Sequence, residues 1–285
     1  MKLALIGVGL IGGSFAAALR AAGAVSQVAG FDADADTTKT ALSRGIIDRA
    51  ATSAADAASA ADLVVVATPV GAMRATFSEI AGALKTSAVV SDVGSTKCSV
   101  IDDARTALGA AFARFVPAHP IAGGERPGVE HAAADLFRNR LVITTSIPAT
   151  DPSAIALVEE LWRKVGARLE RLSPEQHDKV FAAVSHLPHL LAFALVEMIA
   201  RGPDAEWRFS HAGAGFRDFT RIAASSPDMW RDVCLANRGP LGEELRAYRA
   251  RLDLLQAAVD AGDGETLHAV FTAAAAAKRG RRTAV

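Results

Sequence analysis

Short, continuous runs of apolar residues recur through the first half of this 285-residue chain and alternate with longer segments of helical composition. A glycine cluster separates the first run from an Ala- and Leu-rich segment at residues 14–22, which predicts the order strand, tight turn, helix. Buried strands are predicted at residues 3–6, 25–31, 63–67, 88–91, 115–118 and 141–145, with helices at 73–84 and 99–111. The alternation predicts an α/β fold with a doubly wound, mostly parallel sheet.

The pattern changes after about residue 172. Strand-like runs disappear, and apolar residues at helical spacing fill residues 174–199, 217–223 and 242–261. Ser173 followed by Pro174 is typical of a helix start, because Ser caps the first backbone N–H groups and Pro fits the first helical position. We therefore predict two domains, an N-terminal one at residues 1–172 and an all-helical one at residues 173–285.

Composition and charge exclude several classes of protein. Lys+Arg and Asp+Glu are both 31, so the chain has no overall charge that would attract nucleic acid or an anionic membrane. Cys98 and Cys234 stand alone, which favours neither a disulfide framework nor a zinc site. The apolar run after Lys2 is broken by glycines, unlike a signal helix, and no other stretch approaches the ~20 apolar residues of a membrane span. A cytoplasmic protein without nucleic-acid or membrane partners is expected.

The glycine cluster has the spacing of a dinucleotide-binding turn. Gly7-x-Gly9-x-x-Gly12 follows the first strand and opens the first helix, where backbone amides can cradle a pyrophosphate. Asp32 stands 20 residues beyond Gly12, where an acid meets the ribose hydroxyls, and this spacing argues against a turn that binds nothing. An acid there repels a 2′-phosphate, and no Arg stands beside it, so NAD is favoured over NADP. The N-terminal domain is thus predicted to be Rossmann-type.

Two more residues are candidates for the cofactor site. Thr68 and Pro69 follow the strand at residues 63–67 and would lie at the carboxyl edge of the sheet, where ligands bind, although a plain turn would look the same. The expected cofactor-binding residues are Gly7, Gly9, Leu10, Ile11, Gly12, Asp32, Thr68 and Pro69.

Four polar motifs follow in order along the chain. DVGSTK at residues 92–97 and HPIAGGE at residues 119–125 each follow a predicted strand, so both loops are expected near the nicotinamide end of the cofactor site. SHLPH at residues 185–189 lies on a predicted helix, and GAGFRDFTR at residues 213–221 precedes SPDMW at 226–230.

Taken together, these motifs resemble the prephenate and arogenate dehydrogenase family, also called cyclohexadienyl dehydrogenases. The resemblance runs from GVGLIGGS in the first turn to at least Trp230. It implies NAD-dependent oxidative decarboxylation of prephenate to 4-hydroxyphenylpyruvate, or of arogenate to tyrosine, in tyrosine biosynthesis. It also implies a homodimer, because the helical domain of such enzymes packs against its twin.

The resemblance assigns expected roles to single residues. His119 matches the catalytic histidine, whose neutral imidazole can take the proton of the ring 4-hydroxyl as hydride leaves. Ser95 matches a supporting catalytic serine, and Arg221 matches the arginine that pairs with a substrate carboxylate. The other matched positions of the substrate site are His189, Arg217, Trp230 and Glu125. We expect folding to bring His119 and Arg221 to opposite sides of one pocket.

The sequence also departs from the family and leaves alternatives. Gly124 and Arg126-Pro127 stand where the family often has Ser or Thr and Lys-Ser, so a hydroxyl donor is missing. Another two-domain dehydrogenase, of the β-hydroxyacid type, would use a lysine of the helical domain, for which Lys179 is the candidate outside any such motif. An inactive dinucleotide sensor is the second alternative. His186 and His189 lie three apart, but no carboxylate or cysteine completes a metal-ligand pattern, so no metal is expected.

Overall fold

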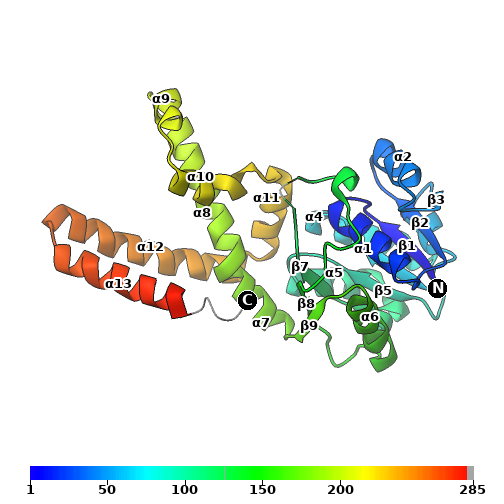
Figure 1. Cartoon of the computed structure of the whole chain (residues 1–285). Helices are drawn as coiled ribbons and strands as arrows, with labels where there is room; N and C mark the ends of the chain where they lie inside the picture. The colour runs from blue at the N-terminus through cyan, green and yellow to red at the C-terminus, as the bar shows by residue number, and fades with distance from the viewer. Residues whose placement is uncertain (125, 281–285) are drawn as a thin grey trace. The chain divides into compact units, whose positions relative to one another are not determined.

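A computed structural model describes residues 1–124 and 126–280 of the chain (Figure 1). The chain folds into two compact units, Met1–Arg238 and Gly239–Val285. The first unit contains the sheets and also the first helices after residue 172, and the domain boundary at residues 172 and 173 stays a prediction.

The main sheet of the first unit is parallel and doubly wound, as the sequence predicted. Its strand order is β3-β2-β1-β4-β5-β6, and every neighbouring pair is parallel. The strands are β1 (Lys2–Ile6), β2 (Gln27–Phe31), β3 (Arg49–Ala50), β4 (Leu63–Val66), β5 (Val89–Asp92) and β6 (Phe115–Val116). The order reverses between β1 and β4, and in such sheets ligands bind beyond the carboxyl ends of the strands at this reversal.

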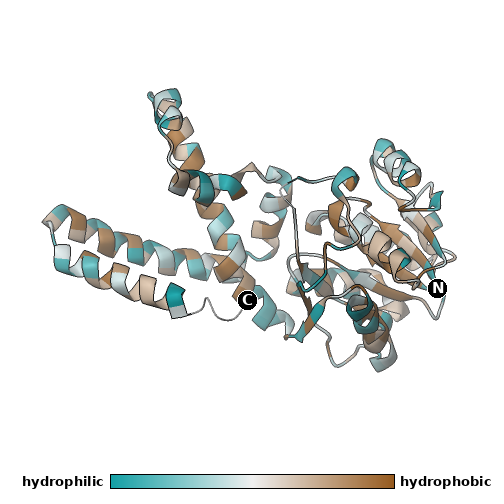
Figure 2. Ribbon diagram, viewed as in Figure 1, coloured by the Kyte–Doolittle hydropathy of each residue, from teal (hydrophilic) through white to brown (hydrophobic). Residues whose placement is uncertain are grey.

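Side chains of β1 alternate between two cores, one on each face of the sheet. Leu3 and Leu5 enter the first core, and Ala4 and Ile6 enter the second. The first core is covered by α1 (Leu10–Ala21), α2 (Ala35–Ser43) and α6 (Pro152–Lys164); the second is covered by α3 (Ala54–Ala58), α4 (Val70–Ala81) and α5 (Cys98–Ala107). Figure 2 shows the strands as a largely hydrophobic layer. Both faces are buried, which is why the strands read as continuous apolar runs.

A second, smaller sheet differs from the prediction. The run at residues 115–118 divides between β6 and β7 (Ala118–Ile121), and β7 pairs antiparallel with β8 (Leu141–Thr144). The β8 strand then pairs in parallel with β9 (Arg168–Arg171). The apolar run at residues 141–145, which we predicted in the main sheet, therefore belongs to the second sheet.

The chain after residue 172 is helical, as predicted. The first helix begins at Pro174 with Ser173 at its N-cap, and Ser173 and Gln176 form a reciprocal capping box. After residue 172, the helical elements of the first unit are α7 (Pro174–Phe181), the π-helical turn η3 (Ala182–His186), α8 (Leu187–Ala200), α9 (Ala205–Ser210), α10 (Ala214–Thr220), η4 (Arg221–Ala224) and α11 (Pro227–Ala236).

The continuous helical segment from α7 to α8 corrects one expectation. Residues Pro174–Ala200 are long and apolar enough to cross a membrane by length and composition, whereas no such stretch beyond the N-terminus was expected from the sequence. Its first turns, however, carry His177 and Asp178, which are buried and hydrogen-bonded to the sheet-bearing part of the unit. Core helices of globular proteins pass the same test of length and composition, so a single helix of this kind is weak evidence of a membrane span.

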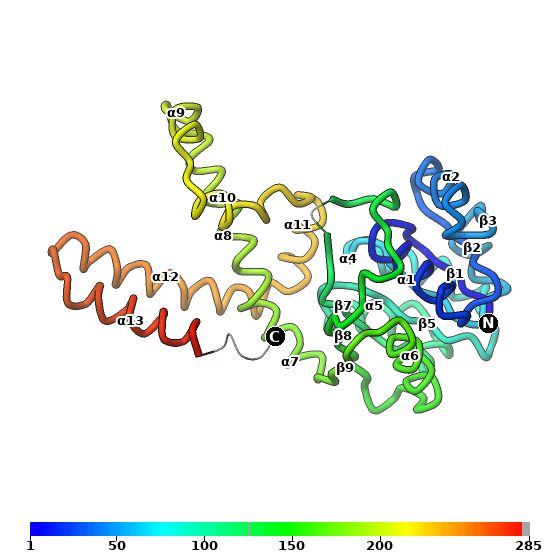
Figure 3. Tube along the Cα trace, viewed as in Figure 1, coloured from blue at the N-terminus to red at the C-terminus, as the bar shows by residue number. Residues whose placement is uncertain are grey.

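The second unit is a helical hairpin. Its helices are α12 (Arg238–Ala261) and α13 (Gly264–Gly280), joined through Gly262, whose φ of 62° suits a glycine. The trace in Figure 3 reverses direction at this turn. Within residues 239–280, only Leu241 and Ala258 are buried.

Candidate active site

The three glycines of the first turn have different physical reasons to be glycine. Gly7 has φ of +88°, and a Cβ there would lie 2.5 Å from the carbonyl oxygen of Ala67. A Cβ on Gly12 would lie 2.3 Å from the carbonyl oxygen of Gly7, so this glycine permits close packing of α1. A Cβ on Gly9 would meet nothing within 4 Å. The structure leaves open space at Gly9, the position where the phosphate of a dinucleotide approaches the backbone.

Asp32 lies at the end of β2 and holds the turn from the opposite side. Its Oδ2 accepts a hydrogen bond from the Val8 N–H at 2.8 Å, and its Oδ1 accepts one from the Asp34 N–H at 3.0 Å. The side chain is half-buried beside the turn. Asp34 and Asp36 add two exposed carboxylates, so the surroundings of Asp32 suit ribose hydroxyls and disfavour a 2′-phosphate.

The remaining cofactor candidates lie at the carboxyl ends of β1 and β4. Leu10 and Ile11 form the first turn of α1, which has no acidic residue and no side-chain cap, so its N–H groups are available to an anion. The Thr68 Oγ1 is buried without a hydrogen-bond partner in the described residues, and Pro69 is the exposed N-cap of α4. An orphaned hydroxyl at this edge is expected where a bound group completes the site. The residues therefore fit a dinucleotide.

His119 lies on β7, the first strand of the small sheet, and not in a loop as predicted. Its Nδ1 is 2.8 Å from the Nε2 of His177, and its ring packs against Phe181 with centroids 4.9 Å apart. The loop that follows β7 returns to the glycine turn, because a Cβ on Gly124 would lie 3.2 Å from the Cδ2 of Leu10. The loop that follows β7, the strand of His119, therefore contacts the start of α1 directly after the glycine turn.

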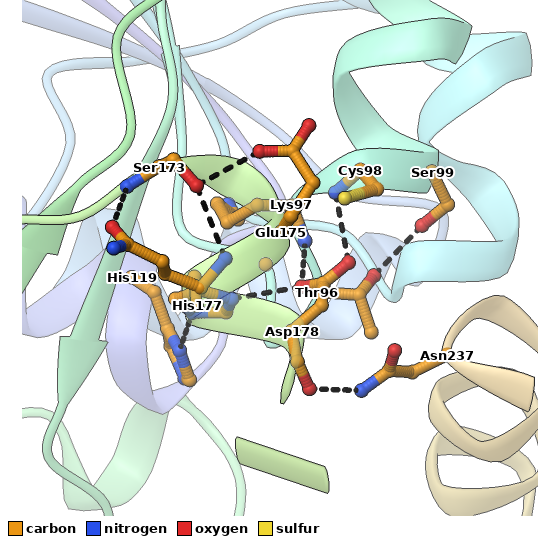
Figure 4. Close-up of polar contacts among 12 residues, drawn as sticks. Thr96, Lys97, Cys98, Ser99, His119, Ser173, Glu175, His177, Asp178 and Asn237 are labelled. Carbon is orange, nitrogen blue, oxygen red and sulfur yellow. Dashed lines mark hydrogen bonds and ion pairs between the residues drawn. The ribbon is translucent and has the colours of Figure 1, made fainter. Parts of the chain in front are cut away.

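A buried carboxylate links the α7 helix to the loop after β5 (Figure 4). The Asp178 Oδ1 accepts the Lys97 N–H at 2.7 Å, and Oδ2 accepts the Cys98 N–H at 2.9 Å. The same Oδ1 lies 2.8 Å from the Nδ1 of His177. The side chain of Asn237, the C-cap residue of α11, donates to the Asp178 carbonyl at 2.8 Å. Loop, helix and imidazole are therefore held in one polar network.

Asp92 and Lys97 form a fully buried pair that fixes the start of β7. The Lys97 Nζ contacts the Asp92 carboxylate and donates to the Ala118 carbonyl at 2.7 Å. The Asp92 Oδ1 accepts the Ala118 N–H at 3.2 Å. Burial raises the pKa of Asp92 and lowers that of Lys97, each opposed by the attraction of the other. Because Ala118 directly precedes His119, this pair positions the imidazole.

The electrostatic surroundings keep the histidines neutral. Burial, followed by the charges of His177, Lys97 and His186, lowers the pKa of His119 well below its usual value. Burial also lowers the pKa of His177, against the opposing effect of Asp178, and that of His186 to about 4. A neutral His119 can accept a proton at physiological pH.

A second group of predicted residues gathers around His189. Its ring stacks on Trp230 with centroids 3.6 Å apart, and its Nδ1 lies 2.9 Å from the Ser185 carbonyl oxygen. Burial lowers the pKa of His189, and the charge of Arg221 lowers it further. Arg221 begins η4, which contacts α8, the helix that carries His189. The buried Nε1–H of Trp230 makes no hydrogen bond to the described residues. His186 lies between the two groups, since its charge acts on His119 and its ring is 6.1 Å from Trp230.

Among the residues that the structure describes, the other predicted ones form no hydrogen bond or ring contact with His119 or His189. Ser95 is half-buried in the loop after β5, and its backbone carbonyl raises the pKa of His186. Arg217 is exposed and donates to the Ala212 carbonyl of its own segment. Glu125 lies outside the described residues. Lys179, the lysine that a β-hydroxyacid-type enzyme would require, is exposed.

His177, Asp178 and Asn237 were not identified from the sequence. They stand in segments without a recognisable motif, and His177 is 58 residues from the His119 that it contacts. Only the fold brings them together. Within residues 1–124 and 126–280, no group of three or more His, Cys, Asp or Glu side chains is arranged to hold a metal ion.

Two family models match nearly the whole chain. The model of the prephenate dehydrogenase nucleotide-binding domain matches residues 15–171, and that of the prephenate dehydrogenase dimerization domain matches residues 173–273.

Individual relatives agree with these matches. Prephenate dehydrogenase of Bacillus subtilis is 35% identical over 95% of this chain and 73% of its own. Cyclohexadienyl dehydrogenase of Zymomonas mobilis is 36% identical over 93% and 90%. The crystal structure of Aquifex aeolicus prephenate dehydrogenase in complex with hydroxyphenyl propionate and NAD+ is 35% identical, covers 98% of both chains and has a TM-score of 0.89. The chain therefore belongs to the prephenate dehydrogenase family.

Proposed function

We propose that this chain is an NAD-dependent dehydrogenase that oxidatively decarboxylates prephenate to 4-hydroxyphenylpyruvate. The observation that carries the proposal is the family match along both halves of the chain, together with a neutral, half-buried His119 on the strand whose following loop approaches the start of α1. The Aquifex relative holds NAD+ and a hydroxyphenyl compound in its crystal structure. The glycine turn, Asp32 and the orphaned Thr68 hydroxyl supply the groups that would hold NAD.

The proposed chemistry needs one proton acceptor and careful positioning. NAD, when bound, accepts the hydride from the ring carbon that bears the 4-hydroxyl. The His119 Nε2 takes the proton of that hydroxyl, so the O–H bond breaks, an N–H bond forms and the oxygen becomes a carbonyl. The ring carboxylate then leaves as carbon dioxide, and its bonding electrons complete the aromatic ring as the carbonyl π electrons move onto oxygen. This oxygen takes back the proton from the His119 Nε2 and becomes the phenol hydroxyl. Because aromatisation is favourable, the protein contributes mainly orientation and charge placement.

The group around His189 suits an anionic ring substrate. Arg221 offers a planar guanidinium for bidentate pairing with a carboxylate, and Trp230 offers an indole N–H without a partner among the described residues. In the proposed site these residues bind the substrate, with Arg217 and Glu125 as further candidates. Ser95 supports His119 and the hydroxyl of the ring. These roles are the ones that the family resemblance implies.

The proposal is tested with purified protein and NAD. Prephenate should reduce NAD, seen as a rise in the absorbance of the reduced nicotinamide, and yield 4-hydroxyphenylpyruvate in equal amount. Arogenate is the matched second substrate, because it carries an amino group in place of the side-chain keto group, and NADP is the matched second cofactor. Absence of turnover with either substrate and either cofactor contradicts the proposal.

The assignment of the base has its own test. His119→Asn keeps a side chain of similar polarity but lacks a titratable nitrogen, so we expect kcat to fall about 10²- to 10⁴-fold. NAD affinity, measured by fluorescence titration, should stay within about twofold, because His119 is not part of the glycine turn. A near-normal kcat would remove His119 from the role of base.

A homodimer and a cytoplasmic location are part of the same proposal. The dimer is supported by the description of the matched C-terminal model as a dimerization domain and by exposed apolar side chains on α12 and α13. The location is tested by cell fractionation, in which prephenate-dependent NAD reduction should remain in the supernatant after the membranes are pelleted.

A further inference from the structure

Three side chains form a hydrogen-bonded row that ends at the proposed catalytic imidazole (Figure 4). The His119 Nδ1 meets the His177 Nε2 at 2.8 Å, and the His177 Nδ1 meets the Asp178 Oδ1 at 2.8 Å. His177 is fully buried and Asp178 is 2% exposed, whereas His119 keeps part of its ring exposed. The row thus runs from an inaccessible carboxylate to an accessible imidazole, and Nε2 is the nitrogen of His119 left for a ligand.

The carboxylate end of the row is ionised. Burial alone would raise the pKa of Asp178, but hydrogen bonds from His177 and from the Lys97 and Cys98 amides outweigh it, so the pKa lies below its usual value. An ionised carboxylate only accepts hydrogen bonds. The nitrogen that faces it, Nδ1 of His177, must therefore carry a proton.

This requirement fixes the protons along the row. His177 is neutral at physiological pH because burial lowers its pKa, and a neutral imidazole has a single N–H. With that proton on Nδ1, the His177 Nε2 has only a lone pair and must accept. The contact at 2.8 Å then requires a proton on the Nδ1 of His119. The opposite arrangement would set the lone pair of the His177 Nδ1 against the carboxylate.

We propose that His177 and Asp178 are positioning residues that hold His119 in the Nδ1–H tautomer and so keep its Nε2 free as the proton acceptor. The identity of the substrate hydroxyl rests on the proposed function, but the tautomer does not. When Nε2 takes the proton, His119 becomes a cation whose Nδ1–H still donates to His177, with the Asp178 carboxylate behind it. The row therefore orients the base before the reaction and stabilises its charge afterwards.

The other charged and titratable groups near His119 do not take over this role. Asp92, the last residue of β5, and Lys97, the N-cap of α5, bond to each other and to Ala118, and Lys97 acts on His119 through its charge. His186, on the π-helical turn, accepts a hydrogen bond from Asn237 at 3.0 Å and likewise acts through charge. Among the described residues, the His119 Nδ1 has its hydrogen bond with His177.

Nitrogen-15 NMR of the protein labelled in its seven histidines reads the tautomer directly. The signals of His119 are identified by their loss in His119→Asn. In the wild type without ligands, His119 should show a protonated Nδ1 and an unprotonated Nε2 at neutral pH. A His119 with its proton on Nε2 overturns the proposal, and this readout requires neither substrate nor turnover.

A matched pair of variants tests the functional consequence. His177→Gln retains an amide oxygen that can accept from the His119 Nδ1, whereas His177→Leu has similar bulk and no acceptor. We expect kcat to fall about 10²-fold or more in His177→Leu with KM for prephenate and NAD within about threefold, and to recover at least tenfold in His177→Gln. His119 should keep a single tautomer in His177→Gln and lose it in His177→Leu.

The outcomes separate the two proposals. If wild-type protein turns over neither prephenate nor arogenate, the proposed function fails while the NMR result stands. If His177→Leu keeps wild-type kcat, the positioning role fails while the function stands. If His177→Leu does not fold, the tautomer of His119 in the wild type and the tautomer and kcat in His177→Gln still test the proposal. A proton on the His119 Nε2 in His177→Gln would contradict it.

Discussion

At the scale of single residues, we expect two glycines of the first turn to serve different purposes: Gly12 is required for packing and Gly9 for cofactor binding. Gly12 faces backbone at 2.3 Å, whereas Gly9 faces open space and has an ordinary φ of −78°. We expect Gly12→Ala to cost about 1–3 kcal/mol of unfolding free energy through overpacking. We expect Gly9→Ala to leave the urea midpoint unchanged but to weaken NAD binding about tenfold or more, because its methyl group occupies the phosphate position.

Calorimetric NAD titrations and urea unfolding of the two variants check this prediction. Each variant is the control for the other, because both add one methyl group to the same turn. Equal losses of stability, or unchanged NAD affinity in Gly9→Ala, would contradict the division of roles.

His186 makes stability depend on pH. Its pKa is 6.5 in the unfolded chain and about 4 in the folded protein, mainly because the side chain is buried. A group with a lowered folded pKa binds protons preferentially in the unfolded state. Its stabilising contribution is therefore complete above pH 6.5 and lost as pH falls towards 4, by about 3 kcal/mol at most.

Urea unfolding at intervals between pH 7.5 and 4.5 measures this loss. His186→Asn should reduce the pH dependence of the unfolding free energy, although His119, His177 and His189, whose pKa values burial also lowers, leave part of it. His268→Asn is the matched control, because His268 is exposed on α13, and it should reproduce the wild-type slope. A wild-type slope in His186→Asn would show that this histidine is not the source.

Sequence spacing found the parts of the site that act through local backbone. Gly7, Gly9 and Gly12 are recognisable because a turn requires them at fixed spacing, and Asp32 follows at a distance set by one strand and one helix. His177, on the helix α7, has no such local reason, because its partner His119 lies 58 residues away on the strand β7. Contacts of this kind depend on the packed fold and leave no periodic trace in the sequence.

At the scale of elements, the apolar pattern located strands but not their sheets. The run at residues 141–145 was expected in the parallel sheet, yet β8 pairs antiparallel with β7. Both kinds of strand are buried and read as short apolar runs, so periodicity cannot separate them. The consequence is functional, because this pairing puts His119 on a strand whose ladder restrains it.

The π-helical turn Ala182–His186 also escaped prediction. Pro188 follows it in the first turn of α8 and has no backbone N–H to donate to the preceding turn. A wider turn at this point lets the helix continue from α7 into α8. It also sets the direction of His186 and His189, which gather with Trp230.

The capping box at Ser173 should matter for stability more than for chemistry. The Ser173 Oγ accepts the Gln176 N–H at 3.1 Å, and the Gln176 side chain accepts the Ser173 N–H at 3.0 Å. We expect Ser173→Ala to lower the unfolding free energy by about 1 kcal/mol. The measurement is urea unfolding, with Ser78→Ala on the exposed face of α4 as the control that should change stability by less than about 0.5 kcal/mol. If Ser173→Ala left the unfolding free energy unchanged, tertiary packing alone would fix the start of α7.

At the scale of the whole molecule, the second unit is too thinly packed to stand alone. A hairpin of two helices that buries only Leu241 and Ala258 within residues 239–280 cannot offset its conformational entropy. On α12, Leu245, Leu252 and Val259 follow one another at seven-residue spacing and are 38%, 47% and 60% exposed. Such a stripe is typical of a helix that packs against another helix.

We therefore expect the stripe on α12 to be covered by a second copy of the chain. Sedimentation equilibrium at micromolar concentration should give about twice the 29.5 kDa chain mass, and the unfolding temperature should rise with protein concentration because association stabilises the folded state. Leu252→Asp combined with Val259→Asp puts two charges into the apolar seam and should shift the mass to that of one chain. Asp253→Lys changes charge on an exposed neighbouring position and should leave the mass doubled. A wild-type mass equal to one chain would contradict the dimer. A doubled mass in the double variant would show that the interface does not include this stripe.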